Sequence, residues 1–122
     1  MESPFKAKTG IKRLINAIGY SFSGFKAAFQ NEDAFRQEVF LTIILVPLAF
    51  YIANNSLEIV LLLFSTLLVP IVELLNSAIE ATVDRISLEQ HKLAKRAKDI
   101  GSAAVFLSLV NLFAIWLIII FY

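Results

Sequence analysis

Two glutamates, an asparagine and an aspartate enter an apolar segment near the middle of the chain. Glu73, Asn76, Glu80 and Asp84 follow directly after a run of leucine, isoleucine and valine. Residues seven apart share one face of a helix, so Glu73 and Glu80 lie on one side, about 10.5 Å apart along the axis. A charged side chain at membrane depth costs roughly 2.5–3.5 kcal/mol even on the most lenient scale, so these residues need a partner or a function.

The spacing separates the expected roles of the two glutamates. Carboxylates about 10 Å apart along one helix cannot both bind a single Mg²⁺ ion, whose oxygen ligands lie at about 2.0–2.1 Å. The deeper Glu73 suits a general base acting on a lipid hydroxyl, and the shallower Glu80 suits a hydrated cation. An alternative is that both only hold a helix bundle together by hydrogen bonds. Glu73, Asn76 and Glu80 together form one polar stripe along the helix, and this favours a functional site.

Two further polar clusters flank the apolar segments. Residues 31–38 are typical of a capped helix start, with Asn31 as the cap and acidic residues in the first turn. Residues 91–99 carry both signs of charge, which a solvated loop explains. Within this cluster, Lys98 and Asp99 could also face a nucleotide.

The composition excludes several other chemistries. The 122 residues include no cysteine and one histidine, which leaves neither a thiolate site nor a histidine-rich metal site. A net charge of +1 gives no reason to expect nucleic acid as a partner. The sequence has no Gly-rich phosphate loop and no protein-kinase catalytic loop, so a kinase here would be unrelated to those folds.

Long apolar helices are the elements that must position these residues. The chain is 58% apolar and 17% charged, whereas an average globular domain is about 45–50% apolar and roughly 25% charged. No Lys or Arg occurs between Arg36 and Arg85 or after Lys98. Because a membrane-spanning helix needs about 20 mostly apolar residues, the pattern predicts three spans. Their expected ranges are 34–54, 57–84 and 96–121.

The basic residues predict how these spans are oriented. They gather before the first span and between the second and the third, whereas residues 54–56 carry none. The positive-inside rule therefore places the N-terminus and the 85–98 connection in the cytoplasm and the C-terminus outside.

The segment before the first span predicts an amphipathic helix. Apolar residues recur every three or four positions from Ile11 to Phe29, and Lys12, Arg13 and Lys26 fall between them. Such a helix, expected at 5–30, suits the cytoplasmic interface of a membrane. The alternative is a helix packed on a protein core.

Four segments resemble the bacterial diacylglycerol kinase family of small integral-membrane proteins. They are Gly19-Tyr20-Ser21 and residues 31–38, 73–85 and 96–104, and the similarity extends from about Arg13 to the C-terminus. The pattern Glu-x-x-Asn-Ser-Ala-Ile-Glu at 73–80 is specific to this family of membrane kinases. The Phe-Arg-Gln-Glu sequence at 35–38 favours the diacylglycerol branch over the related undecaprenol kinases.

The resemblance implies an all-α membrane protein that forms a homotrimer of three-span subunits, each with an N-terminal surface helix. It implies active sites shared between subunits at the cytoplasmic side of the bacterial inner membrane. The implied reaction transfers the γ-phosphate of ATP to sn-1,2-diacylglycerol, with Mg²⁺ as cofactor, and gives phosphatidic acid. An undecaprenol kinase stays an alternative, as does a non-catalytic membrane protein such as a small transporter or an assembly subunit.

The resemblance also assigns roles by position. Glu73 resembles the general base, supported by Asn76, and Glu32 and Glu80 resemble the carboxylates that hold Mg²⁺ against ATP. The positions that resemble nucleotide contacts are Arg13, Tyr20, Glu32, Glu80, Glu89, His91, Lys98 and Asp99. Those that resemble contacts to the lipid substrate are Arg13, Ser21, Glu73 and Trp116.

Overall fold

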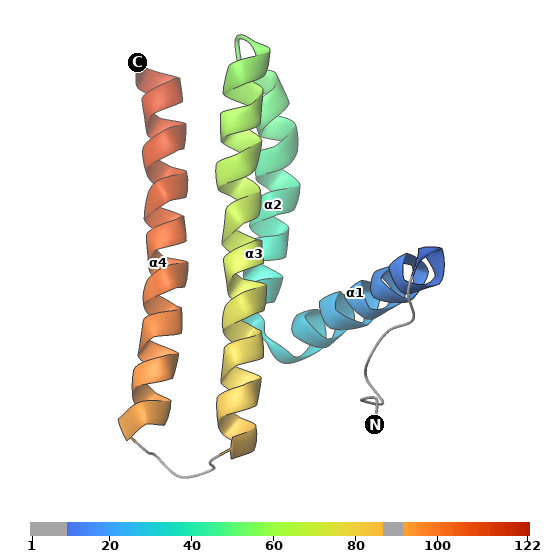
Figure 1. The fold of residues 1–122 in the computed structure, drawn as a ribbon. Coiled ribbons are helices and arrows are strands. Elements are labelled where there is room, and N and C mark those ends of the chain that lie inside the picture. The colour runs from blue at the N-terminus through green and yellow to red at the C-terminus, as the bar shows by residue number, and fades with distance from the viewer. Residues whose placement is uncertain (1–9, 87–91) are drawn as a thin grey trace.

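The structure is a computed structural model that describes residues 10–86 and 92–122. Helices are the only regular secondary structure in these residues. In chain order they are α1 (Ile11–Asn31), α2 (Asp33–Ile52), α3 (Ser56–Ile86) and α4 (Lys92–Phe121). The helices α2, α3 and α4 form an antiparallel bundle with α3 in the middle, and α1 projects sideways from the end where α2 begins (Figure 1). The expected all-helical fold is confirmed.

The helix ends differ from the expected ranges for local reasons. The first helix begins at Ile11, after Gly10 with its positive φ of 77°, and residues 5–9 of the expected range lie outside the described part. Helix α2 ends at Ile52, because Ala53 is already extended, so the expected end at residue 54 is wrong. Residues 92–95, which include Lys92 and Lys95 and were expected in a loop, begin α4 instead.

Each of the three long helices is long and apolar enough to cross a membrane. Their outer faces carry large apolar side chains, and Phe64, Phe106 and Phe113 are exposed by 60–68%. So extensive an apolar surface is unusual for a protein in water, whereas the hydrocarbon of a membrane accommodates it. The architecture is therefore that of a membrane helical protein.

A small core joins the three long helices at the end away from α1. Ala49, Leu62, Val69, Leu112 and Trp116 form it. The indole Nε1 of Trp116 donates a hydrogen bond of 3.1 Å to Thr66 Oγ1, and that hydroxyl donates to the Leu62 carbonyl oxygen at 2.7 Å. The buried indole N–H is thus satisfied across the α3–α4 contact.

Removing this hydrogen bond should destabilise the α3–α4 contact by a measurable amount. Trp116→Phe and Thr66→Val are each expected to lower the free energy of unfolding, with a coupling of about 0.5–1 kcal/mol between them. A double-mutant cycle from chemical denaturation in detergent measures that coupling separately from the change in side-chain size. Strictly additive effects would show that the hydrogen bond contributes nothing.

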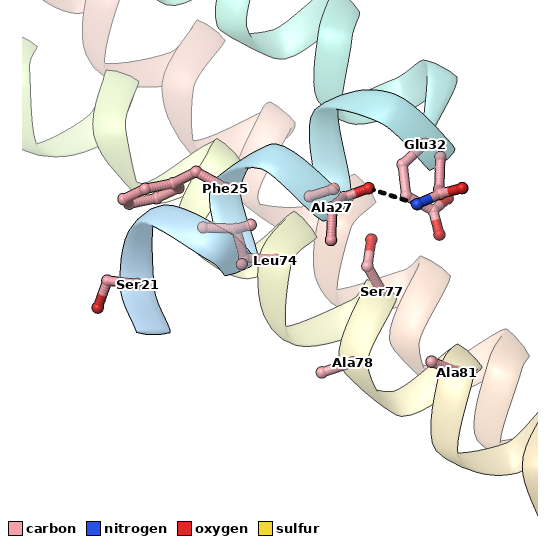
Figure 2. Close-up of a pocket in the computed structure, with 11 residues that line it drawn as sticks. Ser21, Phe25, Ala27, Glu32, Leu74, Ser77, Ala78 and Ala81 are labelled. Atoms are coloured by element: carbon pink, nitrogen blue, oxygen red, sulfur yellow. Dashed lines mark hydrogen bonds between the residues drawn. The ribbon is translucent and has the colours of Figure 1, made fainter. Parts of the chain in front are cut away.

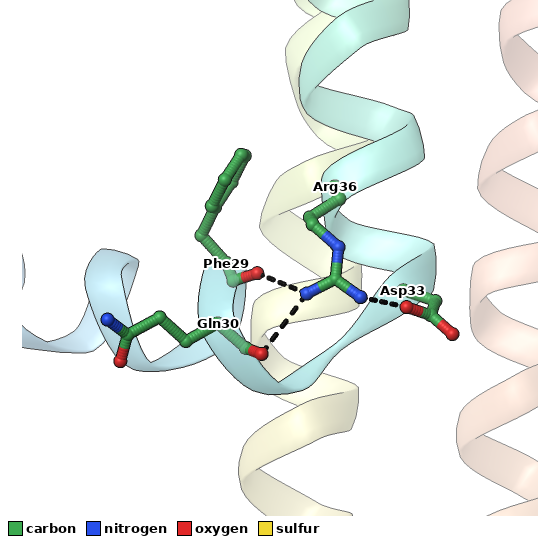
Figure 3. Close-up of polar contacts among 4 residues, drawn as sticks. All are labelled: Phe29, Gln30, Asp33 and Arg36. Atoms are coloured by element: carbon green, nitrogen blue, oxygen red, sulfur yellow. Dashed lines mark hydrogen bonds and ion pairs between the residues drawn. The ribbon is translucent and has the colours of Figure 1, made fainter.

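Arg36 holds the corner between α1 and α2. Its guanidinium donates hydrogen bonds to the carbonyl oxygens of Phe29 at 2.6 Å and Gln30 at 3.1 Å, and it pairs with Asp33 (Figure 3). The last carbonyls of a helix have no partner within it and carry partial negative charge, so a cation there satisfies and stabilises them. Between the two helices, Glu32 is extended, with φ −122° and ψ 110°.

The expected cap at this corner is wrong. Asn31 is the last residue of α1, and its Nδ2 donates to the Ala27 carbonyl oxygen at 2.8 Å. The N-cap of α2 is Glu32, whose side chain makes no capping hydrogen bond. Arg36 accounts for the difference, because its side chain binds the last carbonyl oxygens of α1. This contact makes Asn31 part of the end of α1, whereas it was expected to start the next helix.

Candidate active site

The polar stripe of α3 faces the inside of the bundle. Glu73 and Asn76 are only 5% and 6% exposed, and Glu80, one turn further along the same face, is half-buried. The neighbouring Leu75 and Ile79 are exposed on the outer side of the helix. The stripe is therefore turned away from the apolar surface that hydrocarbon would cover.

An amide connects the carboxylates of this stripe. Asn76 Nδ2 donates a hydrogen bond of 3.3 Å to Glu80 Oε1, and the same amide interacts with the Glu73 carboxylate. Glu73 is also within electrostatic reach of both Glu80 and Glu32. The structure thus brings together four of the predicted site residues, three from α3 and one from the α1–α2 corner.

A fifth acidic residue, Glu38 of α2, belongs to this neighbourhood and was missed by the sequence reasoning. It is 8% exposed, its Oε2 has no hydrogen-bond partner among the described residues, and its carboxylate interacts electrostatically with Glu73. The sequence does contain a signal for a buried acidic residue, because Glu38 lies about one turn inside an apolar span and no basic residue follows it until Arg85. By sequence alone, its place in the 31–38 cluster favours a helix start.

Because Glu38 and Glu73 repel each other, we expect the protein to be more stable with a neutral side chain at position 38. We expect Glu38→Gln to raise the free energy of unfolding by about 1 kcal/mol, because it replaces an unpartnered buried carboxylate with an uncharged group. Chemical denaturation in detergent at pH 8 measures the change. Glu58→Gln, at the opposite end of the bundle, is the matched control, and a decrease specific to position 38 would contradict the expectation.

A pocket of about 600 Å³ lies beside the stripe, between α1 and α3. Phe25 and Leu74 line its apolar part, and Ser21, Ser77 and Glu32 supply polar groups (Figure 2). The Ser77 hydroxyl, which has no partner among the described residues, is directed toward the corner that carries Glu32 (Figure 2). A pocket with one apolar and one polar part suits an amphiphilic molecule.

A second, almost wholly apolar groove of about 690 Å³ adjoins the pocket and lies between α1, α2 and α3. It shares Phe25 and Leu74 with the pocket, and Phe29, Val39 and Pro70 extend it along the bundle. The two cavities together lead from the acidic stripe into the apolar half of the molecule.

Lys98 of α4 approaches the acidic stripe from the other side. Its Nζ forms an ion pair of 2.6 Å with Asp84 Oδ1 and interacts electrostatically with Glu80. The adjacent Asp99 instead pairs with Lys95 at 2.7 Å on an exposed face. Of these two predicted nucleotide contacts, only Lys98 lies beside the stripe.

The remaining predicted positions lie apart from this cluster or beyond the described residues. Arg13 and Tyr20 are exposed on α1, which projects away from α4 (Figure 1). Ser21 lines the pocket and donates to the Ala17 carbonyl oxygen at 2.9 Å. Trp116 lies in the core with Thr66 and lines neither cavity. Glu89 and His91 lie outside the described residues.

Comparison with known proteins decides the family. Residues 19–120 match the family model of prokaryotic diacylglycerol kinase. The chain belongs to this family. Three relatives named diacylglycerol kinase match it over nearly their whole length. The relative from Pseudomonas aeruginosa is 56% identical over 93% of each chain. The relative from Haemophilus influenzae is 52% identical over 88% of this chain and 92% of the relative, and the relative from Escherichia coli is 49% identical over 91% of each chain.

The acidic residues of this diacylglycerol kinase family member fit a Mg²⁺ ion carried by a nucleotide. No three His, Asp or Glu side chains of the described residues form a metal site on their own. Mg²⁺ commonly takes one or two carboxylates and completes its shell with phosphate oxygens and water. Glu73 is repelled by both Glu80 and Glu32, and none of the three has an ion pair within the described ranges. A cation would relieve this repulsion.

Proposed function

We propose that this multi-pass membrane protein transfers the γ-phosphate of ATP to the free hydroxyl of sn-1,2-diacylglycerol and so forms phosphatidic acid. The single observation that carries the proposal is a buried carboxylate, Glu73, held beside Asn76 and Glu80 next to a pocket of mixed polarity. Burying a carboxylate among other carboxylates is unfavourable for folding alone. A role in chemistry explains why the chain keeps it, and the names of its relatives supply the reaction.

Glu73 is the proposed general base. It accepts the proton of the lipid hydroxyl as that oxygen forms a bond to the γ-phosphorus, and the bond from this phosphorus to the bridging oxygen of ADP breaks. Asn76 donates to the Glu80 carboxylate and also interacts with the Glu73 carboxylate, and it would thereby orient both groups. Phosphoryl transfer depends mainly on positioning and on electrostatic stabilisation, which this arrangement supplies.

The charges around the base have matching proposed roles. Glu32 and Glu80 would hold Mg²⁺, which when bound offsets the negative charge of the ATP phosphates. Lys98 adds a protein cation beside them, and Asp84 holds its ammonium group in place at 2.6 Å. Of the remaining predicted positions, Arg13, Tyr20, Glu89, His91 and Asp99 are proposed to contact the nucleotide.

A homotrimer with shared sites is part of the proposal. Within one chain, Arg13 and Tyr20 lie on α1, which projects away from α4, the helix that contains Lys98 (Figure 1). A second subunit would therefore be needed to bring such groups to one nucleotide. Trp116 is only 6% exposed within one chain, and a contact between it and the lipid substrate remains a proposal from the resemblance alone.

Membrane placement follows from charge and apolar surface. We infer that the protein lies in the bacterial inner membrane, with its N-terminus and the α3–α4 connection on the cytoplasmic side. Helix α1 would lie in the cytoplasmic interface, because Ile11, Ile15 and Phe22 are exposed by 62–77% without protein to cover them. With this placement the pocket would lie near the membrane interface, where we expect the hydroxyl of a diacylglycerol.

A lipid panel tests the proposed function. The purified protein is incubated in mixed micelles with radiolabelled ATP, Mg²⁺ and either sn-1,2-diacylglycerol or a C55 polyprenol. We expect labelled phosphatidic acid and less than a tenth of that rate with the polyprenol. Preferential labelling of the polyprenol would show an undecaprenol kinase. Absence of Mg²⁺-dependent transfer to either lipid would favour a non-catalytic membrane protein.

A further inference from the structure

Gly101 of α4 lies directly against Asn76 of α3. It is buried, and a Cβ atom built on it would be 1.9 Å from Asn76 Oδ1 and 3.0 Å from Asn76 Cγ. No pair of carbon and oxygen atoms approaches to 1.9 Å without a bond, so a side chain at 101 requires Asn76 to move or the two helices to separate. By contrast, nothing lies within 4 Å of a Cβ built on Gly10, Gly19 or Gly24.

The contact also determines which way the Asn76 amide points. Its Nδ2 donates to Glu80 Oε1, whereas its Oδ1 is buried without a hydrogen-bond partner in the described residues. The Cα hydrogen of Gly101 that a side chain would replace is directed at this Oδ1, as in the weak Cα–H···O contacts of closely packed helices. The opposite amide orientation would place Oδ1 against the Glu80 carboxylate, which is repulsive.

We propose that Gly101 is a positioning residue for phosphoryl transfer, and that its missing side chain holds the Asn76 amide toward Glu80 and Glu73. The inference rests on the proposed function, since it concerns the same site. Glycine is a poor helix former, so its presence inside α4 needs a reason. Small residues in membrane helices usually allow two helices to approach closely. Here the close approach falls on the one amide that links the carboxylates.

Gly101→Ala tests this inference, with Gly19→Ala as the control. Both changes add one methyl group to a helical glycine, but only the first meets an atom. We expect Gly101→Ala to lower kcat at least tenfold with the KM for diacylglycerol changed less than twofold, because the pocket is untouched. Gly19→Ala should keep the wild-type kcat. A Gly101→Ala variant that keeps more than half of the wild-type kcat would overturn the proposal.

The double variant Gly101→Ala with Asn76→Ala separates positioning from simple packing. If the methyl group acts through Asn76, it lowers the thermal midpoint by about 5 °C or more in the wild type and by less than 2 °C when Asn76 is absent. The methyl group should also add no further loss of kcat to Asn76→Ala. If it instead costs the same stability or activity in both backgrounds, or if the double variant also fails to fold, the glycine serves helix packing alone.

The outcome for wild type keeps the two proposals distinct. Absence of lipid phosphorylation by wild type and Gly19→Ala would refute the proposed function, whatever Gly101→Ala does. Active wild type with an equally active Gly101→Ala would refute only the role of Gly101.

Discussion

Glu73→Gln should lower kcat by about 10³-fold, within the 10²- to 10⁴-fold range that a positioned general base contributes. Glutamine has nearly the same shape and can still accept a hydrogen bond, but it cannot take the proton of the lipid hydroxyl. The KM values for MgATP and diacylglycerol should change little, because the pocket and the acidic pair at 32 and 80 stay in place. Initial rates with radiolabelled ATP in mixed micelles measure both parameters.

Glu58→Gln is the matched control for this change. It makes the same substitution on the same helix, 15 residues and therefore about 22 Å away along the axis. Glu58 accepts hydrogen bonds from Asn54 and Asn55 at the opposite end of the bundle. We expect wild-type activity from this control. A Glu73→Gln protein that is folded by circular dichroism and keeps more than a tenth of wild-type kcat would show that another group takes the proton.

The burial of the α3 stripe could be predicted from the sequence because it depends on one helix. Glu73, Asn76 and Glu80 share a face through helical periodicity alone. Exposing several polar groups to hydrocarbon is so unfavourable that this face had to turn inward. Local pattern and the membrane together were sufficient, and no knowledge of α2 or α4 was needed.

The missed residues depend on how helices cross. Gly101 meets Asn76 only because α3 and α4 pack in one particular register, and the sequence of α4 by itself contains a glycine among other small residues. Glu38 likewise becomes informative only once α2 is placed against Glu73. Asn31 was a reasonable cap by propensity, but the contact of Arg36 with the end of α1 overrode it.

Glu80→Gln should lower kcat by about 10²-fold at a fixed, low Mg²⁺ concentration, in the range expected when one electrostatic contact to the transferred group is removed. Unlike the change at 73, this loss should be partly recovered at higher Mg²⁺, because a carboxylate that binds the ion can be compensated by mass action. A titration of rate against free Mg²⁺ at constant MgATP measures the shift, with an expected rise of about tenfold or more in the half-saturating concentration.

Two comparisons make the result at Glu80 specific. Glu73→Gln should show the wild-type Mg²⁺ dependence at its low rate, because additional Mg²⁺ cannot replace a base that does not bind the ion. Asp84→Asn, which removes only the partner of Lys98 at 2.6 Å, should also leave the Mg²⁺ dependence unchanged. Identical Mg²⁺ curves for wild type and Glu80→Gln would contradict the assignment of Glu80. The carboxylate at 80 would then act through its hydrogen bond from Asn76, as a support for the base and not as a ligand.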